Sequence, residues 1–199
     1  MYFDITGVIL AGGKSSRMGV NKSFLELGNQ SIIERIVDLM KSIFSEVIII
    51  TNTPDEYKFL NLPLYKDIYK WKGPLAGIHS GLLNSKTEQN FVISCDVPLM
   101  NKEMIEYILE YKSDKPIKFC EAAGYHQPLV GCYSKKILKE IEKFISNNEM
   151  IDKSFHCFLK SVDAEIIHPE KLLFYKDELF FNLNRPEDYD KLKLKFDQY

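Results

Sequence analysis

A glycine-rich loop with several cations carries the first candidate chemistry in this chain. The apolar residues 8–11 run into the pair Gly12-Gly13, and Lys14, Arg17 and Lys22 follow. Backbone N–H groups of such a loop, with ammonium and guanidinium groups beside them, suit phosphate oxygens. A glycine pair alone is also common in plain turns, and neither the Walker A nor the G-x-G-x-x-G pattern is present. The placement of Arg17 and Lys22 nevertheless predicts a polyphosphate site.

Polar side chains follow three further apolar runs. Asp96 could satisfy a local turn, or it could be a ligand of Mg²⁺, which favours one or two carboxylates plus substrate phosphates. Asn52 and Asp67 could cap the loops that follow them, or they could hydrogen-bond a base edge or a ribose. If all three face the cationic loop, the nucleotide and metal interpretations are favoured.

The elements that must position these residues alternate between strand and helix. Short connections between them indicate a parallel α/β sheet, in which ligands bind outside the carboxyl ends of the strands. The loop, Asn52, Asp67 and Asp96 should therefore converge on one crevice. We predict strands at 4–11, 46–51, 64–67 and 91–95, with helices over 32–43 (behind a capping box, Ser31 with Glu34), near 55–60, from Pro74 to 83, and from Asn101 to 109.

The second half of the chain is less regular. It predicts strands at 117–123 and 127–133 around a turn, helices over 134–146 and 150–161, short strands at 165–168 and 180–182, and a last helix from 184. We see no linker or internal repeat. The expectation is a single domain over 1–199, with about 1–112 as its nucleotide-binding half and about 113–199 completing one side of the crevice.

Composition excludes several classes of protein. The 199 residues carry a formal net charge of -2 with a pI of about 6.1, which argues against a nucleic-acid binder that works by bulk charge. No apolar run approaches the ~20 residues needed to span a bilayer, and the N-terminus lacks a signal peptide's basic region. The four cysteines form no C-x-x-C pair, so buried free thiols in a reducing compartment are expected. We expect a cytoplasmic protein without nucleic-acid or membrane partners.

Taken together, the motifs resemble those of the molybdenum cofactor guanylyltransferases (MobA). The similarity spans about residues 5–190. Its most specific parts are the second glycine motif, at 73–77, followed by Asp-x-Pro at 96–98 and the late asparagine motif at 182–187. The family usually has Asp where this chain has Asn21. The matching motifs are Leu10-Ala-Gly-Gly13, Arg17-Met-Gly19, Lys22, Gly73-Pro-Leu-Ala-Gly77, Asp96-Val-Pro98 and Asn182-Leu-Asn184-Arg-Pro-Glu187.

The resemblance implies a Rossmann-like nucleotidyltransferase fold, α/β in class, with a mostly parallel central sheet flanked by helices on both faces. It implies Mg²⁺-dependent transfer of GMP from GTP to the phosphate of molybdopterin or Mo-molybdopterin, with release of pyrophosphate. It also implies partner proteins that deliver molybdopterin or mature molybdoenzymes, and a molybdopterin side in the second half, around 126–128.

The resemblance assigns roles to individual residues as well. The catalytic set would be Arg17, Lys22 and Asp96, with Asp96 also binding the metal. Further active-site positions would be Asn182 and Asn184. The GTP-binding set would be Leu10, Ala11, Gly12, Gly13, Lys22, Asn52, Asp67 and Asp96.

Three other functions remain open from the sequence. A molybdopterin cytidylyltransferase would use CTP, although its relatives typically show Leu-Ala-Ala-Gly and lack the second glycine motif. A sugar-1-phosphate nucleotidyltransferase shares the first glycine motif. A GTP-binding adaptor without catalysis would not need the whole set of Arg17, Lys22 and Asp96.

Overall fold

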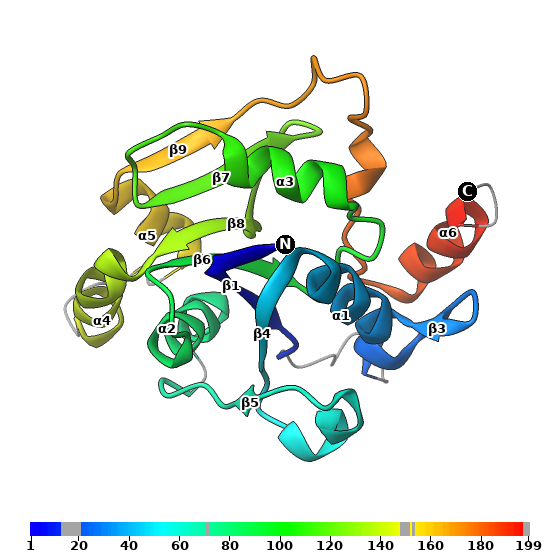
Figure 1. Cartoon of the computed structure of the whole chain (residues 1–199), viewed down its shortest axis with the longest axis horizontal. Helices are drawn as coiled ribbons and strands as arrows, with labels where there is room; N and C mark the ends of the chain where they lie inside the picture. The colour runs from blue at the N-terminus through cyan, green and yellow to red at the C-terminus, as the bar shows by residue number, and fades with distance from the viewer. Residues whose placement is uncertain (13–20, 71, 148–151, 153, 197–199) are drawn as a thin grey trace.

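A seven-stranded sheet forms the centre of the molecule in the computed structural model, which describes residues 1–12, 21–70, 72–147, 152 and 154–196 (Figure 1). The strand order is β5-β4-β1-β6-β8-β7-β9. Within the described sheet, β8 runs antiparallel to its neighbours β6 and β7, and the other pairings are parallel. The strands are β1 (Tyr2–Leu10), β4 (Phe44–Ile50), β5 (Leu64–Tyr65), β6 (Gln89–Ser94), β7 (Ile117–Ala122), β8 (Tyr125–Ser134) and β9 (Ala164–Ile167).

Helices cover both faces of this sheet, as the resemblance implied. The α-helices are α1 (Ile32–Ile43), α2 (Pro74–Asn84), α3 (Lys102–Glu110), α4 (Leu138–Ser146), α5 (Phe155–Ser161) and α6 (Pro186–Phe196). The short elements are the 3₁₀ helices η1 (Lys22–Phe24), η2 (Pro54–Leu60), η3 (Lys135–Ile137) and η4 (Asp177–Phe180), and a separate hairpin, β2 (Glu26–Leu27) with β3 (Gln30–Ser31).

Alternation along the central strands divides the core into two layers. Side chains of successive strand residues point to opposite faces. Ile9 therefore packs in one apolar cluster with residues of α1 and α3, whereas Val8 packs in the other with residues of α2, α4 and α5. Because both faces are covered, the strands are apolar at consecutive positions, and this pattern made them predictable.

Two helices begin where side-chain caps were predicted. Ser31 Oγ accepts the Glu34 N–H while the Glu34 carboxylate accepts the Ser31 N–H, which is the expected capping box. Asn101 Oδ1 accepts the Met104 N–H at the start of α3. These caps fix the positions at which the chain turns back from the sheet.

Helix α2 lies unusually close to β1. A Cβ atom at Gly81 would stand 2.5 Å from Cγ1 of Val8, which is closer than real contacts allow. One turn earlier, a Cβ at Gly77 would stand 3.2 Å from Cδ2 of Leu10. Gly81, together with Gly77 of the second glycine motif, thus lets α2 approach the end of β1, where the candidate site begins.

Several predictions for the chain need correction. Residues 180–182 form no strand: η4 ends at Phe180, and Phe181 caps it by donating its N–H to the carbonyl of Glu178 before the chain continues as irregular, extended backbone. The predicted strand 64–67 ends at Tyr65. Helix α5 begins only at Phe155, because Ser154 caps it. The predicted helix 134–146 opens with a 3₁₀ turn before α4.

The cysteines also differ in part from expectation. Cys95, Cys120 and Cys132 are buried free thiols, whereas Cys157 is only half-buried. Burial raises the pKa of the Cys95 thiol to about 11, so it stays protonated at neutral pH.

The C-terminal helix α6 returns to the beginning of the chain, beside the β2–β3 hairpin (Figure 1). Leu192 of α6 packs with Leu27, Ile32 and Leu183 in a third apolar cluster. The Arg35 guanidinium carbon lies 4.5 Å from the centre of the Phe196 ring. In the described part of the chain, every helix is too short or too polar to cross a membrane.

Candidate active site

An ion pair joins two of the predicted site residues. Lys22 opens η1 directly after the glycine-rich loop, and Asp96 follows β6. The Lys22 Nζ atom lies 2.8 Å from Oδ2 of Asp96, and the two side chains are only 21% and 13% exposed. Charge-assisted hydrogen bonds that are shielded from water in this way are stronger than surface pairs. The structure therefore brings Lys22 and Asp96 together as the sequence predicted.

A backbone segment near the C-terminus completes this pair. The Leu183 carbonyl accepts a hydrogen bond from Lys22 Nζ at 3.0 Å, and the Leu183 N–H donates to the Asp96 carbonyl at 2.9 Å. Sequence reasoning missed Leu183 because backbone groups are the same for every residue type. The available signal was its position between Asn182 and Asn184 in the late motif.

The second carboxylate oxygen of Asp96 is buried and has no hydrogen-bond partner in the described part of the chain. An ionised carboxylate with a vacant oxygen can accept a metal ion. The described residues include no group of three or more His, Cys, Asp and Glu side chains that could hold a metal. Mg²⁺ fits this arrangement, because it can be bound by one carboxylate together with substrate phosphates.

A second pair lies at the ends of β4 and β5. The Asn52 side-chain amide donates to Oδ2 of Asp67 at 2.8 Å. Burial raises the pKa of Asp67, and the hydrogen bond from Asn52 lowers it by less. The Cβ position at Gly77 lies 3.7 Å from Oδ1 of Asp67, so the glycine leaves room beside this carboxylate. The structure thus brings these two predicted residues into contact.

The end of β1 lies between the two pairs, since the order is β5-β4-β1-β6. The Ala11 N–H donates to Ile50 at 2.9 Å and the Leu10 carbonyl accepts from Cys95 at 3.1 Å, so these groups belong to the sheet. Gly12 is exposed, and a Cβ there would stand 3.9 Å from the Asn52 amide nitrogen. The predicted residues Gly13 and Arg17 lie outside the described residues.

The late asparagines have different positions. Asn182 is half-buried and its side-chain amide donates to the Phe180 carbonyl at 3.0 Å. Asn184 is exposed, and its backbone N–H donates to Oδ2 of Asp188 at 3.0 Å, at the start of α6. Within the described part of the chain, Asn182 thus lines a cavity and hydrogen-bonds Phe180 rather than Lys22 or Asp96, and the backbone of Asn184 is bonded at the start of α6.

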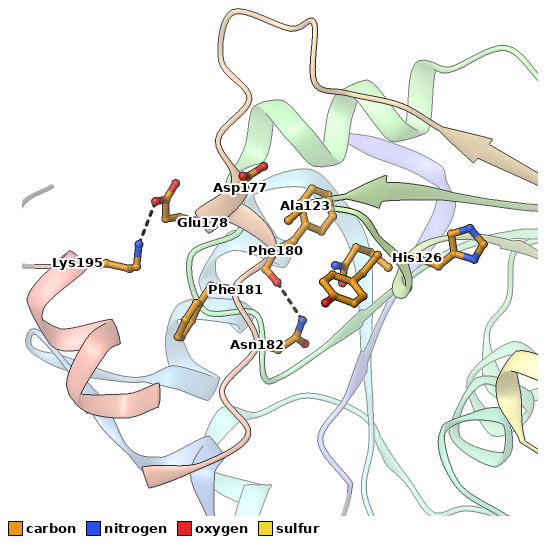
Figure 2. A pocket seen from close by; sticks show the side chains of 10 residues that line it. Ala123, His126, Asp177, Glu178, Phe180, Phe181, Asn182 and Lys195 are labelled. Atoms are coloured by element: carbon orange, nitrogen blue, oxygen red, sulfur yellow. Dashed lines mark hydrogen bonds and ion pairs between the residues drawn. The ribbon is translucent and has the colours of Figure 1, made fainter. Parts of the chain in front are cut away.

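A cavity of about 420 Å³ borders Asn182 (Figure 2). It lies between the β7–β8 hairpin, η4 and α6. Lys195 lines it and pairs with Glu178 at 3.0 Å, whereas the His126 imidazole points away from Asn182 and pairs with Glu121 at 3.1 Å. Its lining consists of Ala123, Tyr125, His126, Gln127, Asp177, Glu178, Phe180, Phe181, Asn182 and Lys195.

Several known proteins are similar to this chain in sequence and in fold. Residues 7–163 match the family described as MobA-like NTP transferase domain. The "Probable molybdenum cofactor guanylyltransferase" of Carboxydothermus hydrogenoformans is 40% identical over 193 residues, covering 95% of each chain. A solved protein from Aquifex aeolicus superposes with a TM-score of 0.76 at 34% identity, covering 90% of this chain and 92% of that one. The molybdopterin-guanine dinucleotide biosynthesis protein A of Archaeoglobus fulgidus gives a TM-score of 0.82 at 21% identity, over 98% of this chain and 100% of that one.

Proposed function

The chain belongs to the MobA-like NTP transferase family and is a nucleotidyltransferase, and on that premise we propose that it transfers GMP from GTP to molybdopterin or Mo-molybdopterin. The acceptor is the phosphate of the pterin, and pyrophosphate leaves. One observation carries the proposal: the half-buried Lys22–Asp96 pair is held by the Leu183 carbonyl, and Asn182, the residue before Leu183, lines the cavity.

The order of strands suggests how GTP lies across the sheet. Guanine presents ring and exocyclic N–H donors, which a carboxylate such as Asp67 accepts well. We place the base beside Asn52 and Asp67, the middle of the nucleotide over Gly12, and the phosphates toward Lys22. Arg17 and Gly13, in the same loop, would contribute further phosphate contacts. The first half of the chain, about 1–112, would then hold the nucleotide.

Mg²⁺ would be held by Asp96, whose vacant carboxylate oxygen is buried. When bound, the ion supplies positive charge that offsets the charge of the triphosphate. Lys22 adds an ammonium group in the same low-dielectric environment, held by Asp96 on one side and Leu183 on the other. These groups are fixed before the substrate arrives, so little reorganisation is needed during transfer.

The chemistry of the acceptor removes the need for a strong general base. The nucleophile is a phosphate oxygen that is already ionised at neutral pH. It forms a bond to the α-phosphorus of GTP while the bond to the pyrophosphate oxygen breaks. The protein must align two anions that repel each other, and Lys22 would stabilise the charge that develops on the transferred group.

The cavity beside Asn182 is our candidate for the molybdopterin side, formed by the second half of the chain, about 113–199. It combines the rings of Phe180 and Phe181 with the amides of Gln127 and Asn182, and Lys195 supplies a cation. Aromatic faces with a few polar groups suit a planar, hydrogen-bonding heterocycle. Its position next to Leu183 would bring the acceptor phosphate toward Lys22.

The free cysteines suit a reducing compartment, so we place the reaction in the cytoplasm, with proteins that deliver molybdopterin and receive the product as partners. The decisive experiment is incubation with molybdopterin, Mg²⁺ and, separately, GTP, CTP, ATP and UTP. We expect a dinucleotide product and pyrophosphate with GTP alone. A product with CTP instead would make the protein a cytidylyltransferase, and pyrophosphate release only with a sugar phosphate would overturn the proposed acceptor.

A further inference from the structure

A network of hydrogen bonds surrounds the backbone of Lys22. Asn21 precedes η1, and its Oδ1 atom accepts the Ser23 N–H at 3.2 Å, which caps the short helix. The Asn21 amide nitrogen donates to Oε2 of Glu56 at 3.0 Å and to the Tyr57 hydroxyl at 3.1 Å. The residue before Lys22 is therefore fixed through both ends of its side-chain amide.

The same hydrogen-bond network continues on the other side of Lys22 and ends at Cys95, the residue before Asp96. The Tyr57 hydroxyl donates to Oγ of Ser23 at 3.2 Å, and Ser23 Oγ lies 3.2 Å from the sulfur of Cys95. Tyr57, Ser23 and Cys95 are all buried. Burial raises the pKa of Tyr57, so its hydroxyl keeps the proton that it donates. The network thus links both neighbours of Lys22 to the residue that precedes Asp96.

At position 21, asparagine can donate hydrogen bonds that aspartate cannot. Either residue could cap η1 through a side-chain oxygen. Only the amide can donate to Glu56 and Tyr57, whereas an aspartate at position 21 would bring a second carboxylate against Glu56. The residue that departs from the family's usual aspartate is therefore matched to its neighbours in this chain.

We propose that Asn21 and Tyr57 are positioning residues that hold the Lys22 ammonium on Asp96 and Leu183 for nucleotidyl transfer. Neither residue needs to touch the substrate. They fix the backbone from which the Lys22 side chain extends, and small displacements of a charge-stabilising group lower the rate strongly. The inference rests on the proposed function only in its kinetic consequence, because the position of the ammonium group can be measured separately.

The kinetic test uses charge-matched variants. Asn21→Asp should lower kcat for GMP transfer about tenfold. Adding Glu56→Gln supplies a new amide donor opposite the aspartate and should recover most of that loss. Tyr57→Phe removes the hydroxyl but keeps the ring, which packs 5.0 Å from Phe24, and should lower kcat severalfold. Glu56→Gln alone and the exposed control Asp55→Asn should remain close to wild type.

A spectroscopic readout separates positioning from general stability. The ¹⁵N signal of the Lys22 ammonium group, assigned with Lys22→Arg, should show slow hydrogen exchange in the wild type and fast exchange in Asn21→Asp and Tyr57→Phe. Unchanged exchange and kcat in both variants would overturn the proposal, and so would a kcat loss that follows Tm without a change at Lys22. If the wild type makes no dinucleotide, the proposed function fails, while the ammonium signal still decides the positioning role.

Discussion

The ammonium nitrogen of Lys22 lies 2.8 Å from a carboxylate oxygen of Asp96, although the two residues are 74 positions apart in the chain. Lys22, at the start of η1, supplies the cation, and Asp96, which follows the strand β6 next to β1, supplies the anion. The pair is therefore a direct product of parallel strand order, in which the ends of distant segments meet at one edge of the sheet.

Replacing Asp96 tests the centre of the candidate site. Asp96→Ala removes the vacant carboxylate oxygen and leaves Lys22 without its charged partner, so turnover should fall at least about 100-fold, as for loss of a main electrostatic stabiliser. Steady-state GMP transfer measures the effect, and the exposed residue Asp114, changed to Ala, is the matched control. Near-normal transfer by Asp96→Ala would remove Asp96 from the active site.

Two glycines of α2 should separate nucleotide binding from stability. In Gly81→Ala the new methyl group would meet Val8 at 2.5 Å. The crowding should cost about 1–3 kcal/mol, more than the about 1 kcal/mol gained in helix propensity, so Tm should fall.

In Gly77→Ala the contacts are wider, 3.2 Å to Leu10 and 3.7 Å to Asp67, so stability should change little. The shift of two proposed GTP contacts should instead raise the Kd for GTP severalfold. Thermal melts and calorimetric titration of both variants provide the comparison. A GTP affinity unchanged in Gly77→Ala would contradict the placement of the nucleotide beside Asp67.

The ionised carboxylate of Asp67 should lower the stability of the fold while it favours GTP binding. Its pKa is raised above the ordinary 3.8, so the folded protein binds this proton more tightly than the unfolded chain. Stability from this group is present below the ordinary carboxyl range and is lost as pH rises through the raised pKa. Asp67→Asn removes that loss, and its carbonyl can still accept from Asn52.

We therefore expect Asp67→Asn to have a higher Tm than the wild type at neutral pH. This difference in Tm should shrink or reverse at acidic pH. The variant should also bind GTP more weakly than the wild type at neutral pH. Thermal melts across this pH range and GTP titrations at neutral pH check both parts. A lower Tm at neutral pH would show that the ionised carboxylate stabilises the fold, contrary to the expected sign.

Much of the fold could be predicted because it follows from local patterns. Consecutive apolar residues marked the buried strands, and Ser31 and Asn101 marked the starts of α1 and α3. The strand predicted at 180–182 was wrong, since two adjacent aromatic residues suit a strand as well as the end of a buried 3₁₀ helix. Phe180 ends η4 and is buried, which periodicity alone could not distinguish.

The candidate site was predictable only where side-chain chemistry is specific. Strand order brings Lys22 to Asp96 and Asn52 to Asp67. Both contacts were predictable, because the alternation of strands and helices places these residues at the same edge of the sheet. The Leu183 contribution is a backbone carbonyl placed by the path of the last segment, and the Asn21–Tyr57 contact depends on how η2 packs. Such contacts are tertiary: the motifs marked the segments of Leu183 and Asn21, but residue type and spacing do not specify which atoms meet.

The Leu183 carbonyl lies 161 positions beyond the lysine that it binds. During synthesis on the ribosome, the glycine-rich loop and the first four strands of the chain emerge long before this acceptor. A partly made chain thus carries the nucleotide loop with Lys22 held on one side only. The backbone acceptor of Lys22 is therefore among the last parts of the chain to be synthesised, and we expect a chain that ends before Leu183 to lack this hydrogen bond.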